Sequence, residues 1–133
     1  MKKRKKPAII ISIKNRQKKI NINKQEIISV AKQVLLIKGK QRAELSILLT
    51  GKRRIRSLNK KFRKIDRVTD VLSFSQFDPE IIGDVVICPE IAKQQLKLCL
   101  IHGILHLLGS DDATKKNRLD MEQEQAQILT RLQ

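Results

Sequence analysis

The sequence predicts a single α+β domain built on a mixed β-sheet. Its 133 residues are enough for one domain with a continuous core, and hydrophobic residues make up 41% of the chain. Short β-branched segments alternate with segments of helical period, but the regular strand–helix repeat of a parallel α/β fold is missing. We therefore expect an α+β fold, with residues 1–133 as one domain.

The first two strands and the helix between them are predicted from residue type and spacing. Residues 8–13 (AIIISI) and 44–50 (ELSILLT) are short apolar runs, which is typical of strands. Between them, Asn23 followed by Glu26 resembles a capping box, and apolar residues then recur with helical period to about residue 37. A strand–helix–strand order is expected here.

A basic helix and two further strands are predicted for the middle of the chain. The helix spans about residues 52–62, and residues 69–74 (TDVLSF) and 83–88 (GDVVIC) are strand-like runs, each introduced by an aspartate. One apolar stripe runs along the basic helix and consists of Ile55, Leu58 and Phe62.

Two more helices are predicted for the last third of the chain. Pro89 suits the first turn of a helix that runs to residue 108, and Gly109 then ends it. A final amphipathic helix is predicted over residues 117–132, with Leu119 among its apolar residues. The expected total is four strands and about four helices.

The charge is distributed unevenly along the chain. Residues 1–67 contain 23 Lys and Arg against 3 Asp and Glu, whereas residues 68–133 contain 6 against 10. The basic residues form local clusters, which favours a nucleic-acid partner over a generally basic protein, although charge alone leaves both open. With no Trp or Tyr and only three Phe, a base-stacking platform of the RRM or OB kind is not expected, so contact should be mostly with phosphates.

Cysteine usage and the N-terminus indicate the compartment. Cys88 and Cys99 form no CxxC pair and fit a reducing cytoplasm. The apolar run after the basic start is shorter than the 7 to 15 residues, roughly, that an export signal needs, and no run of about 18 apolar residues exists. We expect a cytoplasmic protein without membrane spans, and residues 1–7 (MKKRKKP) as a disordered basic arm that adds affinity for phosphates.

The segment HGILHLLGSDD at 102–112 contains both histidines of the chain. On a helix, His102 and His106 point the same way and can share a metal ion, and the turn at Gly109 can return Asp112 to it. Zinc suits such a set and would keep a position for water, although core histidines are an alternative interpretation. Gly103 replaces the glutamate of the H-E-x-x-H zinc proteases, which disfavours peptide hydrolysis.

Several motifs together resemble the YbeY family of bacterial endoribonucleases. HGILHLLGSDD is similar to that family's H-G-x-L-H-L-x-G-Y-D-H, and LNKKFRKIDRVTDVLSF at 58–74 is similar to its L-N-x-x-[YF]-R-x-x-D-x-x-T-D-V-L-S-F. IGDVVICPE at 82–90 and MEQEQAQIL at 121–129 resemble its glycine–aspartate strand and its closing helix. The motifs occur in the family's order from residue 45 onward.

The resemblance implies a small α+β domain with a four-stranded mixed sheet and a metal site on a central helix and the following turn. It implies metal-dependent cleavage of single-stranded RNA in rRNA maturation and ribosome quality control. The ribosomal subunit and rRNA would be partners, with no small-molecule cofactor. By motif position, His102 and His106 take two ligand places of a Zn²⁺ site, and the family's arginine falls on Arg63, where it would steady a phosphate. Thr69, Asp70 and Ser73 are expected to shape the cleft.

Three departures from the family pattern stand out. The third histidine is Asp112 here, the family's Tyr-Asp is Ser110-Asp111, and the segment between Cys88 and His102 is shorter than usual. A carboxylate can bind zinc, but it lowers the effective charge on the ion and raises the pKa of a bound water. We therefore predict a retained site of His102, His106 and Asp112, with Asp111 as the alternative third ligand and another divalent metal as the alternative to zinc.

Two other functions stay open at this point. A ribosome- or rRNA-binding factor without catalysis would keep the fold and the basic half, and the change at Asp112 favours it. A metal-dependent hydrolase acting on another substrate is disfavoured by the same basic half. No residue stands out as a general base.

Overall fold

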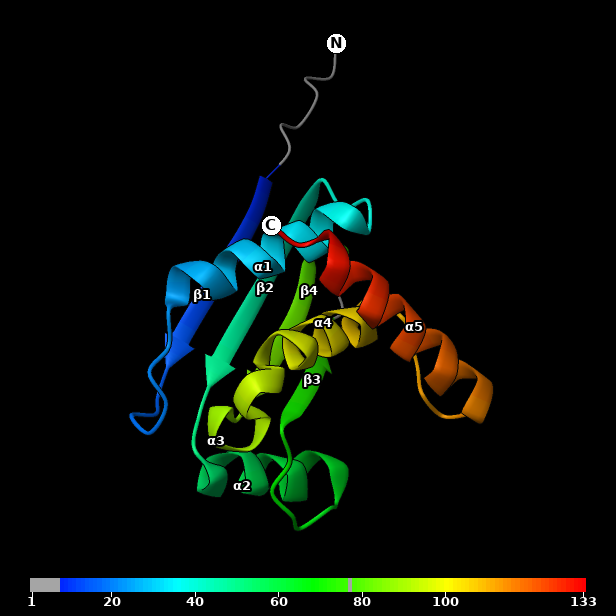
Figure 1. Cartoon of the computed structure of the whole chain (residues 1–133). Helices are drawn as coiled ribbons and strands as arrows, with labels where there is room; N and C mark the ends of the chain where they lie inside the picture. Colours follow the sequence, from blue (N-terminus) through cyan, green and yellow to red (C-terminus); the bar gives the residue numbers. More distant parts are fainter. Residues whose placement is uncertain (1–7, 77) are drawn as a thin grey trace.

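A four-stranded mixed sheet lies at the centre of the fold (Figure 1). The computed structural model describes residues 8–76 and 78–133, so the basic arm and Phe77 lie outside the described residues. The strands follow the order β1-β2-β4-β3, with β2 parallel to β1 and β4, and β3 antiparallel to β4. Their bounds are Ala8–Asn15 (β1), Arg42–Leu49 (β2), Val71–Ser75 (β3) and Ile81–Ile87 (β4). The predicted mixed sheet is confirmed.

Among the described residues, four longer helices and one short helix surround the sheet. They span Lys24–Ile37 (α1), Lys52–Arg63 (α2), Pro89–Ala92 (α3), Leu96–Leu107 (α4) and Lys115–Arg131 (α5), and a 3-10 turn at Lys93–Gln95 joins α3 to α4. The predicted cap of α1 is present, since the Asn23 side chain accepts a hydrogen bond from the backbone N–H of Glu26. Within the described ranges, no helix has both the length and the apolar character to cross a membrane.

The prediction of one helix from residue 89 to 108 is wrong. Lys93 has a φ of 50°, which is outside the helical range, so α3 ends after four residues and α4 begins anew at Leu96. Helix α4 therefore begins separately from α3, and its residues Leu100, Ile101 and Ile104 are buried. Neither glycine nor proline marks the interruption, so the local sequence carried no signal for it.

The main core lies between the inner face of the sheet and the helices α1, α4 and α5 (Figure 1). Alternate residues of a strand face opposite sides of the sheet, and Ile47, Leu49 and Val85 face inward. In α5, Met121 is buried, whereas Leu119, predicted as part of the apolar stripe, is 55% exposed. Helix α4 is central, because it contacts α1, α5, β3 and β4.

Helix α2 packs on the opposite, outer face of the sheet. It covers a second, smaller apolar cluster formed by Ile55, Leu72, Val86 and Cys88, with Leu48, Leu58 and Phe74 packed against it. The outward residues of β2 and β4 are the sequence neighbours of the inward ones, as the two-residue period of a strand requires. The sheet therefore separates an inner side, which contains α4, from an outer side that α2 covers only in part.

Candidate functional site

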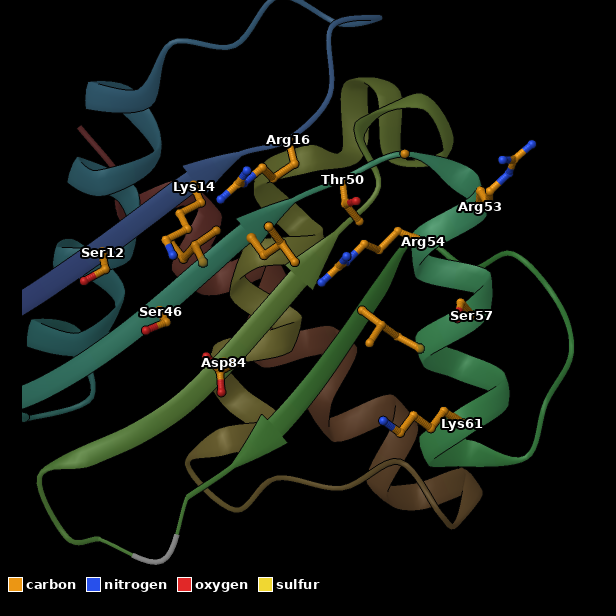
Figure 2. Close-up of a pocket in the computed structure, with 14 residues that line it drawn as sticks. Ser12, Lys14, Arg16, Ser46, Thr50, Arg53, Arg54, Ser57, Lys61 and Asp84 are labelled. Atoms are coloured by element: carbon orange, nitrogen blue, oxygen red, sulfur yellow. The ribbon is translucent and has the colours of Figure 1, made fainter.

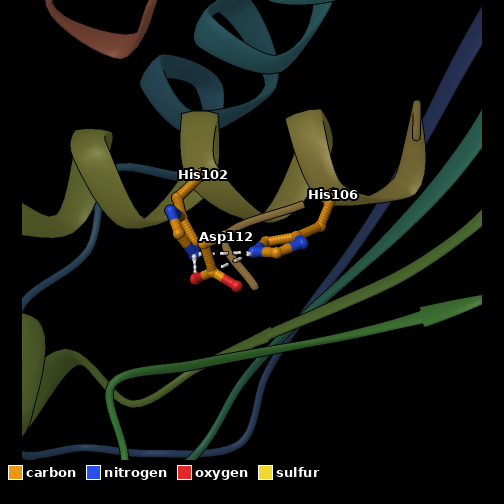
Figure 3. Close-up of side chains that lie close together, drawn as sticks. All are labelled: His102, His106 and Asp112. Atoms are coloured by element: carbon orange, nitrogen blue, oxygen red, sulfur yellow. Dashed lines mark hydrogen bonds and ion pairs between the residues drawn. The ribbon is translucent and has the colours of Figure 1, made fainter. Parts of the chain in front are cut away.

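The two histidines face each other on one side of α4. His102 and His106 are four residues apart, and their Nε2 atoms lie 3.0 Å apart (Figure 3). Both side chains are partly accessible, at 30% and 28% exposure, so the rings are not core histidines. The predicted convergence of the pair is present in the structure.

Asp112 joins the histidines, and Asp111 does not. An Oδ2 atom of Asp112 lies 3.7 Å from Nε2 of His106 and 4.0 Å from Nε2 of His102 (Figure 3). Asp111 instead accepts hydrogen bonds from the backbone N–H of Ala113 and from the side chain of Asn117 at the start of α5. Asp111 therefore organises the turn, and the aspartate beside the histidines is the one that the sequence favoured.

The three side chains fit a divalent cation in type and spacing. Potential ligand atoms of His102, His106 and Asp112 all lie within 4.8 Å of one another. Ligand atoms around a tetrahedral zinc lie about 3.3 Å apart, since Zn–N bonds are about 2.0–2.1 Å, so a small closure of Asp112 would complete the set. Two imidazoles and one carboxylate also leave a fourth position for water.

The electrostatics of the cluster favour the form of histidine that binds metals. Burial lowers the pKa of His102, and the neighbouring His106 lowers it further, whereas Asp112 and Asp70 act in the opposite direction. A neutral imidazole offers a lone pair, as metal binding requires. With His102 neutral, its approach to Asp112 is not an ion pair. The two Nε2 atoms share a hydrogen bond in which one ring donates, and a cation could replace that proton once it has moved to Nδ1.

Gln125 of α5 is a site residue that the sequence reasoning missed. Its amide nitrogen lies 2.6 Å from Nδ1 of His102, the ring nitrogen that does not face His106. A histidine that binds a metal through Nε2 carries its proton on Nδ1 and donates it to a neighbouring acceptor, which fixes the orientation of the ring. In the structure the amide nitrogen of Gln125 faces Nδ1 as a donor, and a half-turn of the carboxamide would present its oxygen as the acceptor that a metal-bound His102 needs.

Replacing Gln125 with alanine should therefore weaken metal binding by about 10- to 100-fold, the usual effect of removing such a partner. Gln125→Glu should retain the affinity, because a carboxylate also accepts from Nδ1–H. Zinc affinity measured by competition with a chromogenic chelator checks this. The matched control is Gln123→Ala, an exposed glutamine of the same helix. Equal affinity in Gln125→Ala and Gln123→Ala would contradict this role.

Cys99 lies one turn before His102 but is a buried thiol and not a fourth ligand. It is 5% exposed, and its Sγ donates to a carboxylate oxygen of Asp70 over 3.5 Å. Burial and the adjacent Asp70 carboxylate raise the pKa of Cys99 to about 12, so the thiol stays protonated at neutral pH. A protonated thiol is a poor metal ligand. Cys99 is therefore a small residue of the core.

Arg63 lies at the end of α2 and is linked to α4 through β3. Its Nη2 donates to the backbone oxygen of Ser73 over 2.6 Å, and the Ser73 hydroxyl donates to the backbone oxygen of Gly103, between the two histidines, over 3.1 Å. No direct bond joins Arg63 to the cluster in the part of the chain that the structure describes. Because a guanidinium carries five N–H donors, others remain for a phosphate.

A basic groove crosses the outer face of the sheet, on the side away from α4 (Figure 2). It has a volume of about 1140 Å³ and lies between α2 and the outward side chains of β1, β2 and β4. Ser12 and Lys14 line it because they alternate with the inward isoleucines of β1. Its five cationic residues are Lys14, Arg16, Arg53, Arg54 and Lys61, beside one carboxylate, Asp84.

Sequence comparisons with known proteins agree on one family. Residues 12–133 match the family model described as Endoribonuclease YbeY. A protein of that description from Aquifex aeolicus is 36% identical over 124 residues, covering 82% of this chain and 80% of its own. One from Bdellovibrio bacteriovorus is 36% identical over 104 residues, covering 69% of each chain. A Thermotoga maritima protein solved in solution has a TM-score of 0.58 and 28% identity, covering 90% of this chain and 86% of that one. The family match thus includes β2, β3, β4, α4 and α5 in full.

Proposed function

The chain belongs to the endoribonuclease YbeY family, and from that premise we propose that it is a metal-dependent endoribonuclease that cuts single-stranded RNA in rRNA maturation and ribosome quality control. The observation that carries the proposal is the convergence of His102, His106 and Asp112 on one point beside an accessible helix face. We propose Zn²⁺ as the ion, with rRNA and the ribosomal subunit as partners.

The residues of the cluster would hold the ion and expose it to RNA. A bound divalent cation would polarise a phosphodiester oxygen and make a water molecule a better nucleophile. Gln125 would hold the His102 ring in position, and the Arg63 guanidinium would contact a non-bridging phosphate oxygen whose negative charge grows during attack. The exposed position of Asp112, at 48%, leaves access for the RNA backbone.

Incubation of the purified protein with labelled RNA tests the proposal. We expect cleavage of a single strand and none of a duplex, loss of cleavage after treatment with a chelator, and recovery with zinc. Recovery with manganese alone would instead assign the His–His–Asp set to another divalent metal. Absence of cleavage under all these conditions, with RNA binding retained, would identify the chain as an rRNA-binding factor. The basic groove supports that second function. It lies on the face of the sheet opposite to α4, so RNA could bind there without contacting the histidine–aspartate cluster.

The groove should supply much of the RNA affinity through phosphate contacts. Reversing two of its charges in Lys14→Glu/Arg16→Glu should weaken binding of single-stranded RNA and reduce the slope of log affinity against log salt by about 1 to 2, since each phosphate contact on a single strand contributes about 0.7. Titration at several salt concentrations measures both. The control Lys32→Glu/Lys40→Glu makes the same change in net charge on exposed residues outside the groove. Equal slopes for the two double variants would place the RNA elsewhere.

A further inference from the structure

We propose that Phe62 and Phe74 form a subsite for one unpaired nucleobase of the RNA, between the basic groove and the histidine–aspartate cluster. This inference rests on the proposed function insofar as RNA is the substrate. The subsite would be the part of the surface that distinguishes a single strand from a duplex.

Phe62 is exposed where burial would be expected for its type. It lies in the last turn of the strongly basic helix α2, and its side chain is 54% exposed. Its ring contacts that of Phe74 on β3 with a centroid separation of 5.2 Å and an interplanar angle of 63°. Phe74 packs against the outer apolar cluster of the sheet. The pair thus has one anchored ring and one ring open to solvent, which is a suitable support for stacking.

Cations accompany both rings. The Nζ atom of Lys61 lies 5.2 Å from the centroid of Phe62, and Cζ of Arg63 lies 5.7 Å from that of Phe74. A nucleotide presents a flat base beside an anionic phosphate. Aromatic rings flanked by cations therefore match it in shape and charge. An acidic peptide would match the cations only, and the aromatic pair therefore favours RNA.

The position of the pair connects the two other parts of the site. Lys61 also lines the basic groove, so the strand that occupies the groove can continue to Phe62. Arg63 donates to Ser73, whose hydroxyl donates to Gly103 between the histidines of α4. A base held at Phe62 would thus keep its neighbouring phosphates near the residues that lead to the cluster. A base already paired in a duplex is not free to stack there.

A tryptophan at position 62 provides a direct measurement. The chain has no Trp and no Tyr, so Phe62→Trp creates a single fluorescent reporter. With metal-stripped protein, which cannot cleave by the proposed route, we expect single-stranded RNA to quench the fluorescence. An abasic oligomer of the same length, an RNA duplex and a poly-glutamate peptide should leave it nearly unchanged. Equal quenching by the abasic oligomer would overturn the subsite, and quenching by the peptide would assign the surface to an acidic protein.

Affinity measurements provide the second test. Phe62→Ala should weaken binding of single-stranded RNA by about tenfold without changing the salt slope, because stacking is lost but no phosphate contact is. Phe62→Tyr should bind like the wild type. The control is Leu36→Ala, which removes a leucine of α1 that is 61% exposed. Unchanged affinity in Phe62→Ala, or an equal loss in Leu36→Ala, would overturn the proposal. Stacking without cleavage in any metal would retain the subsite and reject only the catalytic function.

Discussion

Replacing His106 with alanine is expected to abolish zinc binding and to lower the RNA cleavage rate by about 1000-fold or more, with RNA affinity nearly unchanged. The ring supplies one of three converging ligand atoms, and a bound metal contributes several kcal/mol of charge stabilisation to the transition state. The groove and Phe62 lie on other elements, which is why binding should survive. Elemental analysis after dialysis, single-turnover cleavage and RNA titration measure the three properties.

A pair of aspartate variants provides the matched control for the third ligand. Asp112→Ala should lose the metal, whereas Asp111→Ala should keep about one ion per chain, because the Asp111 carboxylate is bonded to Ala113 and Asn117 instead. Loss of metal from Asp111→Ala alone would show that Asp111, and not Asp112, is the third ligand. A wild-type protein that binds no metal would reject the metal centre altogether.

Replacing Gly83 with alanine is expected to destabilise the fold by about 2–6 kcal/mol, a large part of the roughly 5–15 kcal/mol that stabilises a typical domain. Gly83 has a φ of 140°, which strains any residue with a Cβ. An added Cβ would lie 2.2 Å from the backbone oxygen of Phe74 and 3.0 Å from the Leu107 side chain. Gly83 also adjoins the register shift between β2 and β4, so neither strand can move aside without disturbing the sheet.

Urea unfolding monitored by circular dichroism measures this effect. The control is Gly51→Ala at the N-cap of α2, where the backbone is extended and an added Cβ meets nothing within 4 Å. Its cost should stay within about 1 kcal/mol. Similar urea midpoints for the two variants would contradict this prediction. They would show that the strands at Gly83 and Phe74 can move apart at little cost.

The parts of the fold that follow from local chemistry could be predicted from the sequence. The cap at Asn23 and the four strands were predicted because capping and apolar periodicity are encoded within a few neighbouring residues. The break at Lys93 could not be, since it depends on how α4 packs against the sheet and no glycine or proline marks it. Leu119 was misassigned for the same reason, because tertiary packing selects which face of α5 is buried.

The candidate site divides in the same way. His102 and His106 are one helical turn apart, so their convergence could be read directly from their spacing. Asp111 and Asp112 are adjacent, and only the path of the turn decides which of them faces the rings. Gln125 lies 23 residues from His102, and its contact needs the packing of α5 against α4. Arg63 was placed by motif alone, and its role in catalysis stays a prediction.

The position of β1 at one end of the sheet also bears on how copies of the protein behave toward one another. Its backbone groups face outward next to a run of isoleucines, of which Ile10 is 53% exposed, and such an edge is a template for pairing with another chain. Lys14 and Arg16 stand on or beside this strand, and the chain carries a net charge of +16. Electrostatic repulsion between copies therefore opposes edge-to-edge association, so the charge that suits an RNA ligand also protects the sheet from aggregation.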